Sequence, residues 1–251
     1  MKDHDYDRPR SRKAKRSTRK RLLIVTEGEV TEVEYFEALK LHLELQSSQL
    51  DVVVEAGPDH EGNTPSRVVR SAVKLRETAR KRQKNRDKLG DLEARIAYDQ
   101  VWVVFDTERE GKNADLFSAA EHALDKGLYV AISRPSFESW FLLHLREGLP
   151  AMATCDDACK KISQITRRKY SREYQKDSKD NADLLWLIDT ILPFTTDAVD
   201  RGKIVAKIAF MTHEAVPDTS GTKVYELVEV LWQSSPLAFL ELETNSPDGE
   251  A

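Results

Sequence analysis

The stretch Tyr98–Asp–Gln–Val–Trp–Val–Val–Phe–Asp–Thr–Glu108 decides the fold class of this chain. Its centre, Val101–Phe105, is apolar without interruption, which is typical of a strand that helices cover on both faces. Similar runs stand at Arg21–Thr26, Asp51–Glu55 and Leu128–Ser133. Segments with helical spacing of apolar residues separate these runs, and such alternation predicts a parallel sheet flanked by helices.

Helical periodicity fills much of the remaining chain. Between the strands it predicts helices over 31–46, 66–88 and 115–126, the first opening with Thr31 and Glu34 in the spacing of a capping box. After residue 135 no further clear strand appears. The helices expected there cover residues 137–146, 155–165, 182–192, 199–211 and 222–233. We therefore predict an α/β fold with a Rossmann-like parallel sheet and a helical C-terminal region.

The composition is that of a soluble protein. Of the 251 residues, 40% are hydrophobic and 33% are charged, and the two cysteines are too few for a disulfide scaffold. The longest apolar runs fall far short of the roughly 20 residues that span a bilayer, and the first residues lack the apolar region of a signal peptide. We expect a cytoplasmic protein with no membrane partner.

The net charge of −4 conceals a strong asymmetry. Residues 1–21 carry ten Lys and Arg against three Asp, a net charge of +7, so the remaining residues carry −11. We interpret residues 1–20 as a flexible basic arm, 21–146 as an α/β domain, 147–235 as a helical region packed on it, and 236–251 as an acidic tail.

A second basic segment is the helix expected over 66–88. It holds ten Lys and Arg and has no apolar residue from Arg80 to Lys88. Both basic segments suit phosphate contact with DNA or RNA, whereas a solubilising tail and a solvated helix end are the alternatives. We expect these segments to bring a polyanion toward the acidic residues described next. The candidate nucleic-acid-binding residues are Arg16, Arg19, Lys20, Arg80, Lys81, Arg82 and Lys84.

Acidic residues directly follow the first and third strands. Glu27 comes after Arg21–Thr26, and Asp106 and Glu108 come after Val101–Phe105. Because the carboxyl ends of parallel strands meet at one edge of a sheet, these carboxylates can share a Mg²⁺ ion, or Mn²⁺ in its place. Surface charges on connecting turns are the alternative. No GxGxxG or GxxxxGK[ST] phosphate loop occurs in the chain, which disfavours dinucleotide and P-loop binding.

Four segments together resemble the RloB-like (AbiL-type) phage-defence proteins, which have a Toprim domain. The resemblance runs from Arg21 to about Trp232, and the order and spacing of the segments make it more specific than the short Toprim motifs alone. The segments are Leu22–Phe36 (LLIVTEGEVTEVEYF), Tyr98–Glu108 (YDQVWVVFDTE), Ser133–His144 (SRPSFESWFLLH) and Thr222–Glu229 (TKVYELVE).

This resemblance implies a Toprim-like fold with a divalent-metal site. Glu27 matches the Toprim glutamate, the general acid or base, and Asp106 matches the first acid of the Asp-x-Asp motif. Glu108 stands where a second aspartate is usual, which keeps the charge but lengthens the side chain. Glu138 matches the acid of the Phe-Glu-x-Trp segment and is the candidate fourth carboxylate. The expected catalytic residues are thus Glu27, Asp106, Glu108 and Glu138, with the first three as metal ligands.

Residues and resemblance together favour a Mg²⁺-dependent nuclease of DNA or RNA that acts in antiviral defence by abortive infection. A non-catalytic nucleic-acid-binding or adaptor subunit is the alternative. The resemblance also implies an ATPase partner of the AAA or ABC type, and a homo-oligomer stays open. We expect His144 to be structural, and Cys155 and Cys159 to be ordinary reduced thiols.

Overall fold

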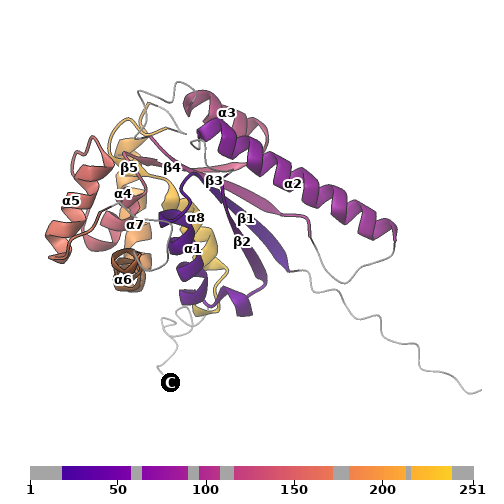
Figure 1. Cartoon of the computed structure of the whole chain (residues 1–251), viewed down its shortest axis with the longest axis horizontal. Coiled ribbons are helices and arrows are strands. Elements are labelled where there is room, and N and C mark those ends of the chain that lie inside the picture. Colours follow the sequence, from indigo (N-terminus) through magenta and orange to yellow (C-terminus); the bar gives the residue numbers. More distant parts are fainter. Residues whose placement is uncertain are drawn as a thin grey trace, which may run out of the picture.

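A five-stranded sheet forms the centre of the computed structural model, in the order β2-β1-β3-β4-β5 (Figure 1). The first four strands are parallel, and β5 pairs antiparallel with β4. The structure describes residues 19–57, 64–89, 96–107, 116–171, 181–212 and 216–238. The strands are β1 (Lys20–Thr26), β2 (Leu50–Ala56), β3 (Gln100–Asp106), β4 (Tyr129–Arg134) and β5 (Gly221–Thr222).

Helices cover both faces of the sheet, so the α/β prediction is confirmed. The helices are α1 (Thr31–His42), α2 (Pro65–Lys88), α3 (Leu116–Asp125), α4 (Glu138–Leu145), α5 (Cys155–Thr166), α6 (Ala182–Ile191), α7 (Thr195–Ala209) and α8 (Val224–Gln233), with short 3-10 turns at Leu45–Ser47 and Leu192–Phe194. No helix in these described segments is long and apolar enough to cross a membrane.

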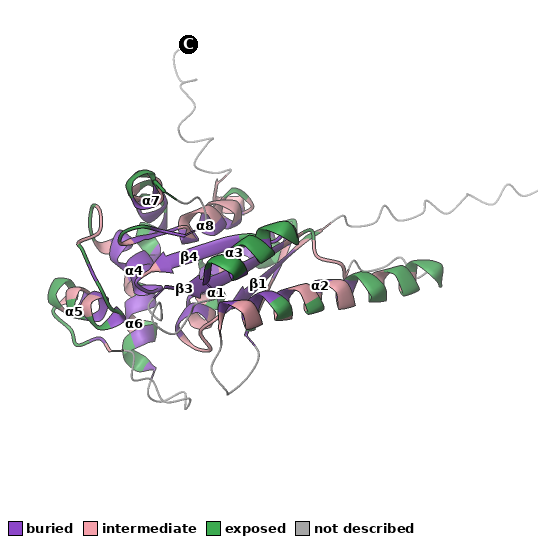
Figure 2. Ribbon diagram, turned by 90° about the horizontal axis from the view of Figure 1, so that it is seen from above, coloured by how far each residue is buried: buried purple, intermediate pink, exposed green. Residues whose placement is uncertain are grey.

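The uninterrupted apolar strands are explained by two separate cores. Alternate residues of a strand point to opposite faces, so Leu22 and Ile24 of β1 pack with α1 and α4–α8, whereas Leu23 and Val25 pack with α2 and α3. Both sets are completely buried, as the ribbon coloured by burial shows for the central strands (Figure 2). The central strands are therefore packed on both faces, and this packing fixes the position of the residues at the carboxyl edge of the sheet.

Two local expectations were wrong. No strand was expected after residue 135, yet β5 adds two residues to the edge, held by a 2.8 Å hydrogen bond between the hydroxyls of Ser133 and Thr222. A strand of two residues has no apolar alternation that a sequence pattern could reveal. The capping box at Thr31 is also absent, because α1 begins at Thr31 after Val30 and has no side-chain cap.

Candidate carboxylate site and basic surface

Glu27 and Asp106 meet at the carboxyl edge of the sheet. Strands β1 and β3 are parallel neighbours, with Thr26 opposite Val104, and the Glu27 backbone N–H donates to the Val104 carbonyl at 2.8 Å. The backbone N–H of Asp106 then donates to Glu27 Oε2 at 3.1 Å. Asp106 is 8% exposed and Glu27 is half-buried. The structure thus brings the Glu27 carboxylate to the backbone of Asp106 at one edge of the sheet, where the strand pattern predicts both residues.

Gly28, next to Glu27 in the chain, leaves room for the carboxylate of Glu32. A Cβ atom at Gly28 would overlap the carboxylate of Glu32, which lies against the backbone of the turn. Glu32 belongs to the first turn of α1 and is only 2% exposed. The hydroxyl of Thr26 donates to the Gly28 carbonyl at 2.7 Å and fixes the same turn. From the sequence alone Glu32 suits either assistance to the acidic site or charge complementarity at the N-terminus of its helix.

Replacing Gly28 with alanine is expected to destabilise the fold by about 1–3 kcal/mol, because the added methyl group overlaps a buried side chain. The partner in this overlap is Glu32, so Glu32→Ala should relieve it. We expect a coupling energy of about 1 kcal/mol or more between the two substitutions in urea denaturation of both single variants and the double variant. Additive effects would show that the two residues do not meet.

Glu138 contacts a thiol and a hydroxyl group through its carboxylate. Its side chain is completely buried, and its carboxylate accepts from Cys155 Sγ at 3.3 Å and from the Tyr170 hydroxyl at 3.5 Å. The sulfur atoms of Cys155 and Cys159 lie 3.7 Å apart, and both residues are buried and form no disulfide. Both contacts come from α5 and the segment that follows it, and a role for Glu138 in catalysis stays a prediction.

Glu138, Cys155 and Cys159 also form a group of potential metal ligands, with one ligand atom from each residue lying within 4.8 Å of the others. Thiolates suit zinc or other soft ions, whereas magnesium takes oxygen ligands. The oxygen donors that fit magnesium are the carboxylates of Glu27 and Asp106. Glu108, the third expected ligand, lies outside the described residues.

His144 is enclosed in the core, in agreement with a structural role. Its ring is 2% exposed, with Nδ1 3.0 Å from the Trp140 carbonyl and Nε2 3.5 Å from the Tyr35 hydroxyl. Removal from water lowers the pKa of His144 to about 3, and the positive Arg201 nearby acts in the same direction. The ring is therefore neutral at physiological pH, between two aromatic residues.

The candidate nucleic-acid-binding residues divide into three groups. Arg16 lies outside the described residues, and Arg19 donates to the backbone carbonyls of Leu45, Gln46 and Ser48. Arg80 is exposed and pairs with Glu77 at 3.0 Å. The other four are exposed, and the part of the chain that the structure describes contains no ion pair for them: Lys20, Lys81, Arg82 and Lys84.

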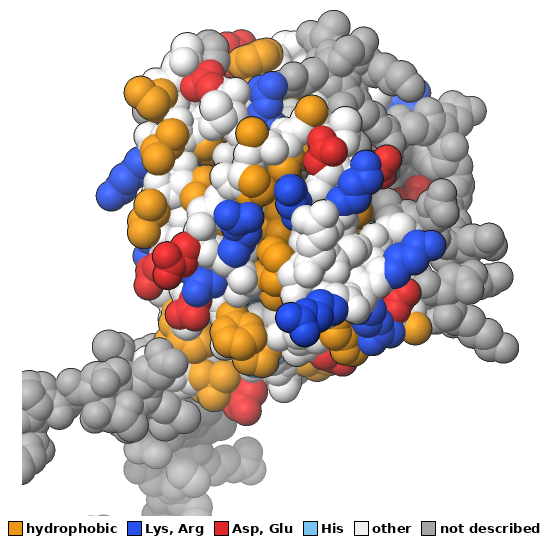
Figure 3. Space-filling model, turned by 90° about the vertical axis from the view of Figure 1, so that its left-hand side faces the viewer, with side chains coloured by type: hydrophobic (Ala, Val, Ile, Leu, Met, Phe, Trp, Pro, Cys, Tyr) orange, Lys and Arg blue, Asp and Glu red, His pale blue; other side chains and the backbone are white. Residues whose placement is uncertain are grey.

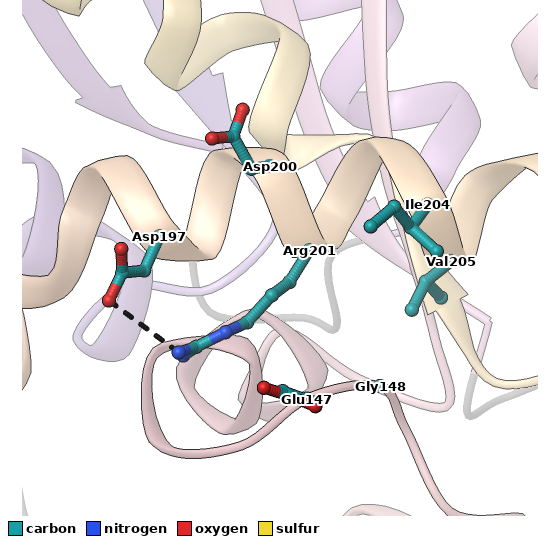
Figure 4. Close-up of a pocket in the computed structure, with 7 residues that line it drawn as sticks. All are labelled: Glu147, Gly148, Asp197, Asp200, Arg201, Ile204 and Val205. Carbon is teal, nitrogen blue, oxygen red and sulfur yellow. Dashed lines mark ion pairs between the residues drawn. The ribbon is translucent and has the colours of Figure 1, made fainter.

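A hollow of about 450 Å³ lies beside α7 and is lined in part by Arg201 (Figure 4). Arg201 reaches across it to Asp197 at 3.5 Å and donates to the carbonyls of Leu143 and His144. Glu147 and Asp200 also line this hollow, so its rim is rich in carboxylates and unsuited to a phosphate. Figure 3, which faces the left-hand side of Figure 1, shows charges of both signs interspersed with apolar side chains.

The fold and the site define an α/β protein in which two neighbouring parallel strands end at acidic residues, Glu27 after β1 and Asp106 in β3. The chain belongs to the RloB-like protein family, whose family model matches residues 22–231. This match begins in β1 and ends in α8, so it includes both strand ends and every helix between them. Neither a curated protein nor a solved structure matches the chain.

Proposed function

We propose that this RloB-like protein is a Mg²⁺-dependent nuclease of the Toprim class that cleaves DNA or RNA in anti-phage defence. One observation carries the proposal: the hydrogen bond that joins the Glu27 carboxylate to the backbone of Asp106 at the carboxyl edge of the sheet. Ligands in open α/β sheets bind at this edge. An acidic pair there suits a divalent cation and, through it, a phosphate group.

Oxygen donors of this kind fit magnesium, with Mn²⁺ as an alternative ion. Asp106 and Glu27 would hold the ion together with Glu108. A bound Mg²⁺ supplies charge neutralisation on the phosphate oxygens. Glu27 would accept a proton from the attacking water or give one to the leaving oxygen. Its bond to the Asp106 N–H would keep the carboxylate at the edge throughout the reaction.

Nucleic acid and an ATPase would be the partners of this chain. Lys81, Arg82 and Lys84 would contact phosphates of the nucleic acid through exposed positive charges. An ATPase of the AAA or ABC type would supply any ATP-driven step, because the chain has no P-loop motif of its own. Both proteins would act in the cytoplasm, where phage nucleic acid is present during infection.

The test is incubation of the purified protein with plasmid, single-stranded DNA and total RNA, in Mg²⁺ or Mn²⁺ and in a chelator. We expect cleavage of at least one substrate with the metal, and none with the chelator. Cleavage that persists in the chelator would contradict a metal-dependent mechanism. Binding without cleavage under every condition, with an ATPase partner present, would favour the adaptor function.

A further inference from the structure

Helix α2 runs from the carboxyl edge of the sheet back to its amino edge. It follows β2, which ends beside β1, where the Gly57 N–H donates to the Thr26 carbonyl at 2.7 Å. The first turns of α2 are buried: Val68 and Val69 belong to the same core as Val25 and Phe105, near the ends of β1 and β3. The start of α2 is therefore level with the candidate carboxylate site.

Two hydrogen bonds show where the other end of α2 lies. Arg76 Nη1 donates to the carbonyl of Lys126, shortly before β4 begins, at 2.6 Å. Gln83 Oε1 accepts from the backbone N–H of Ile96 at 2.7 Å, shortly before β3 begins. Residues from Arg80 onward thus lie at the amino edge or beyond it, where α2 projects past the sheet (Figures 1 and 2).

The projecting end of α2 is almost entirely basic. We call the exposed cations Lys81, Arg82, Lys84 and Lys88 the amino-edge surface. None of these four has an ion pair within the described segments, and the acid among them, Asp87, accepts from the Gln83 side chain at 2.8 Å. Lys20, at the start of β1, is exposed at the same edge. The charges of this surface are consequently available to a polyanion.

The amino-edge surface and the carboxylate site lie at opposite ends of the sheet. Helix α2 has 24 residues, and at about 1.5 Å per residue the 19 steps from Pro65 to Lys84 span roughly 29 Å. Strand β1 has 7 residues, and at about 3.3 Å per step it spans about 20 Å. The basic end of this helix does not adjoin the acidic residues, because a helix that follows a parallel strand returns to the opposite edge.

We propose that the amino-edge surface is an anchor for the phosphate backbone of duplex nucleic acid, separate from the carboxylate site. The proposal rests on the proposed function, and it adds a minimum substrate length. A separation of roughly 29 Å corresponds to about 9 base pairs at 3.4 Å each. A duplex is rigid over this length, so it can contact both ends of the sheet without the entropic penalty of ordering a flexible single strand.

The binding test uses duplexes of about 30 base pairs, one DNA and one RNA, in a chelator so that no cleavage occurs. The anchor variant is Lys81→Gln/Arg82→Gln/Lys84→Gln. Its dissociation constant in fluorescence anisotropy should rise about tenfold or more at low salt, and the slope of log Kd against log salt should fall by about 2 to 3 for three lost phosphate contacts. The duplex that shows the larger change identifies DNA or RNA as the ligand.

A matched control removes three exposed lysines from α5–α7: Lys160→Gln/Lys169→Gln/Lys207→Gln. This control changes the net charge equally, and its dissociation constant and salt slope should stay close to those of the wild type. If both triple variants lost affinity for the duplex equally, the effect would depend on net charge alone, and the anchor would be overturned. An unchanged salt slope in the anchor variant, with circular dichroism showing an intact fold, would overturn it as well.

Cleavage provides a second measurement, with Mg²⁺ present. A hairpin-capped duplex of about 6 base pairs has a helical length of about 20 Å, which is shorter than the roughly 29 Å from the start of α2 to Lys84. The anchor variant should therefore lose kcat/KM on the long duplex and keep it on the short one. Equal losses on both lengths would contradict the anchor. If the wild type, with an ATPase partner present, cleaves neither these duplexes nor plasmid, single-stranded DNA or total RNA, the proposed nuclease function fails, while the chelator experiment still decides whether the anchor exists.

Discussion

Replacing Asp106 with asparagine is expected to lower the rate of phosphodiester cleavage by about a hundredfold or more while leaving the fold intact. The substitution keeps the volume of the side chain and removes the negative charge that would hold the cation. Asp106 is largely buried at the end of β3, and its backbone N–H still donates to Glu27 after the change. Thermal unfolding without metal should stay close to that of the wild type.

Glu27→Gln separates proton transfer from metal binding. The amide oxygen of glutamine can still accept from the Asp106 N–H, so we expect the edge to keep its geometry. Glutamine cannot exchange a proton in this pH range, and cleavage should fall as far as in Asp106→Asn. Metal affinity should fall less than in Asp106→Asn if Asp106 is the main ligand.

The measurements are cleavage rate and Mg²⁺ titration for the wild type, both variants and the control Asp125→Asn. Asp125 is exposed at the end of α3, so its loss should change neither quantity. Cleavage at the wild-type rate in Asp106→Asn would remove the proposed site. A wild-type protein that binds nucleic acid but does not cleave it, even with an ATPase partner, would be an adaptor.

The sheet and the meeting of Glu27 with Asp106 could be predicted from the sequence. Apolar runs such as Val101–Phe105 that alternate with helical segments indicate strands buried under helices on both faces. Parallel strands then place the residues that follow them at a common edge, so the proximity of two distant acids follows from topology alone. The same rule could have placed the basic end of α2 at the amino edge, because that helix must reverse direction after β2.

Contacts that depend on packing between helices could not be predicted. The direction of the Glu138 carboxylate is set by the approach of α5 to α4, which brings Cys155 and Tyr170 to it. The bonds of Arg19 to backbone carbonyls depend on the turn after α1, so a basic residue that suits phosphate contact instead holds the chain. Neither arrangement leaves a periodic pattern in the sequence.

Acidification should destabilise the fold through His144. Burial lowers the pKa of this ring to about 3, against 6.5 in an unfolded chain, so the unfolded state binds the proton more tightly. The contribution to stability is therefore complete above pH 6.5 and is lost as the pH falls toward 3. Between pH 7.5 and pH 5 this loss amounts to about 2 kcal/mol, from 1.36 kcal/mol per pKa unit.

Urea denaturation at both pH values checks this expectation in the wild type, in His144→Phe and in the control His122→Gln. His144→Phe keeps an aromatic ring beside Trp140 and Tyr35 but cannot bind a proton, so its stability should fall about 2 kcal/mol less than that of the wild type between the two pH values. His122 is exposed on α3, and its replacement should leave the pH dependence unchanged. The same pH dependence in His144→Phe and in the wild type would show that His144 is not a buried neutral ring.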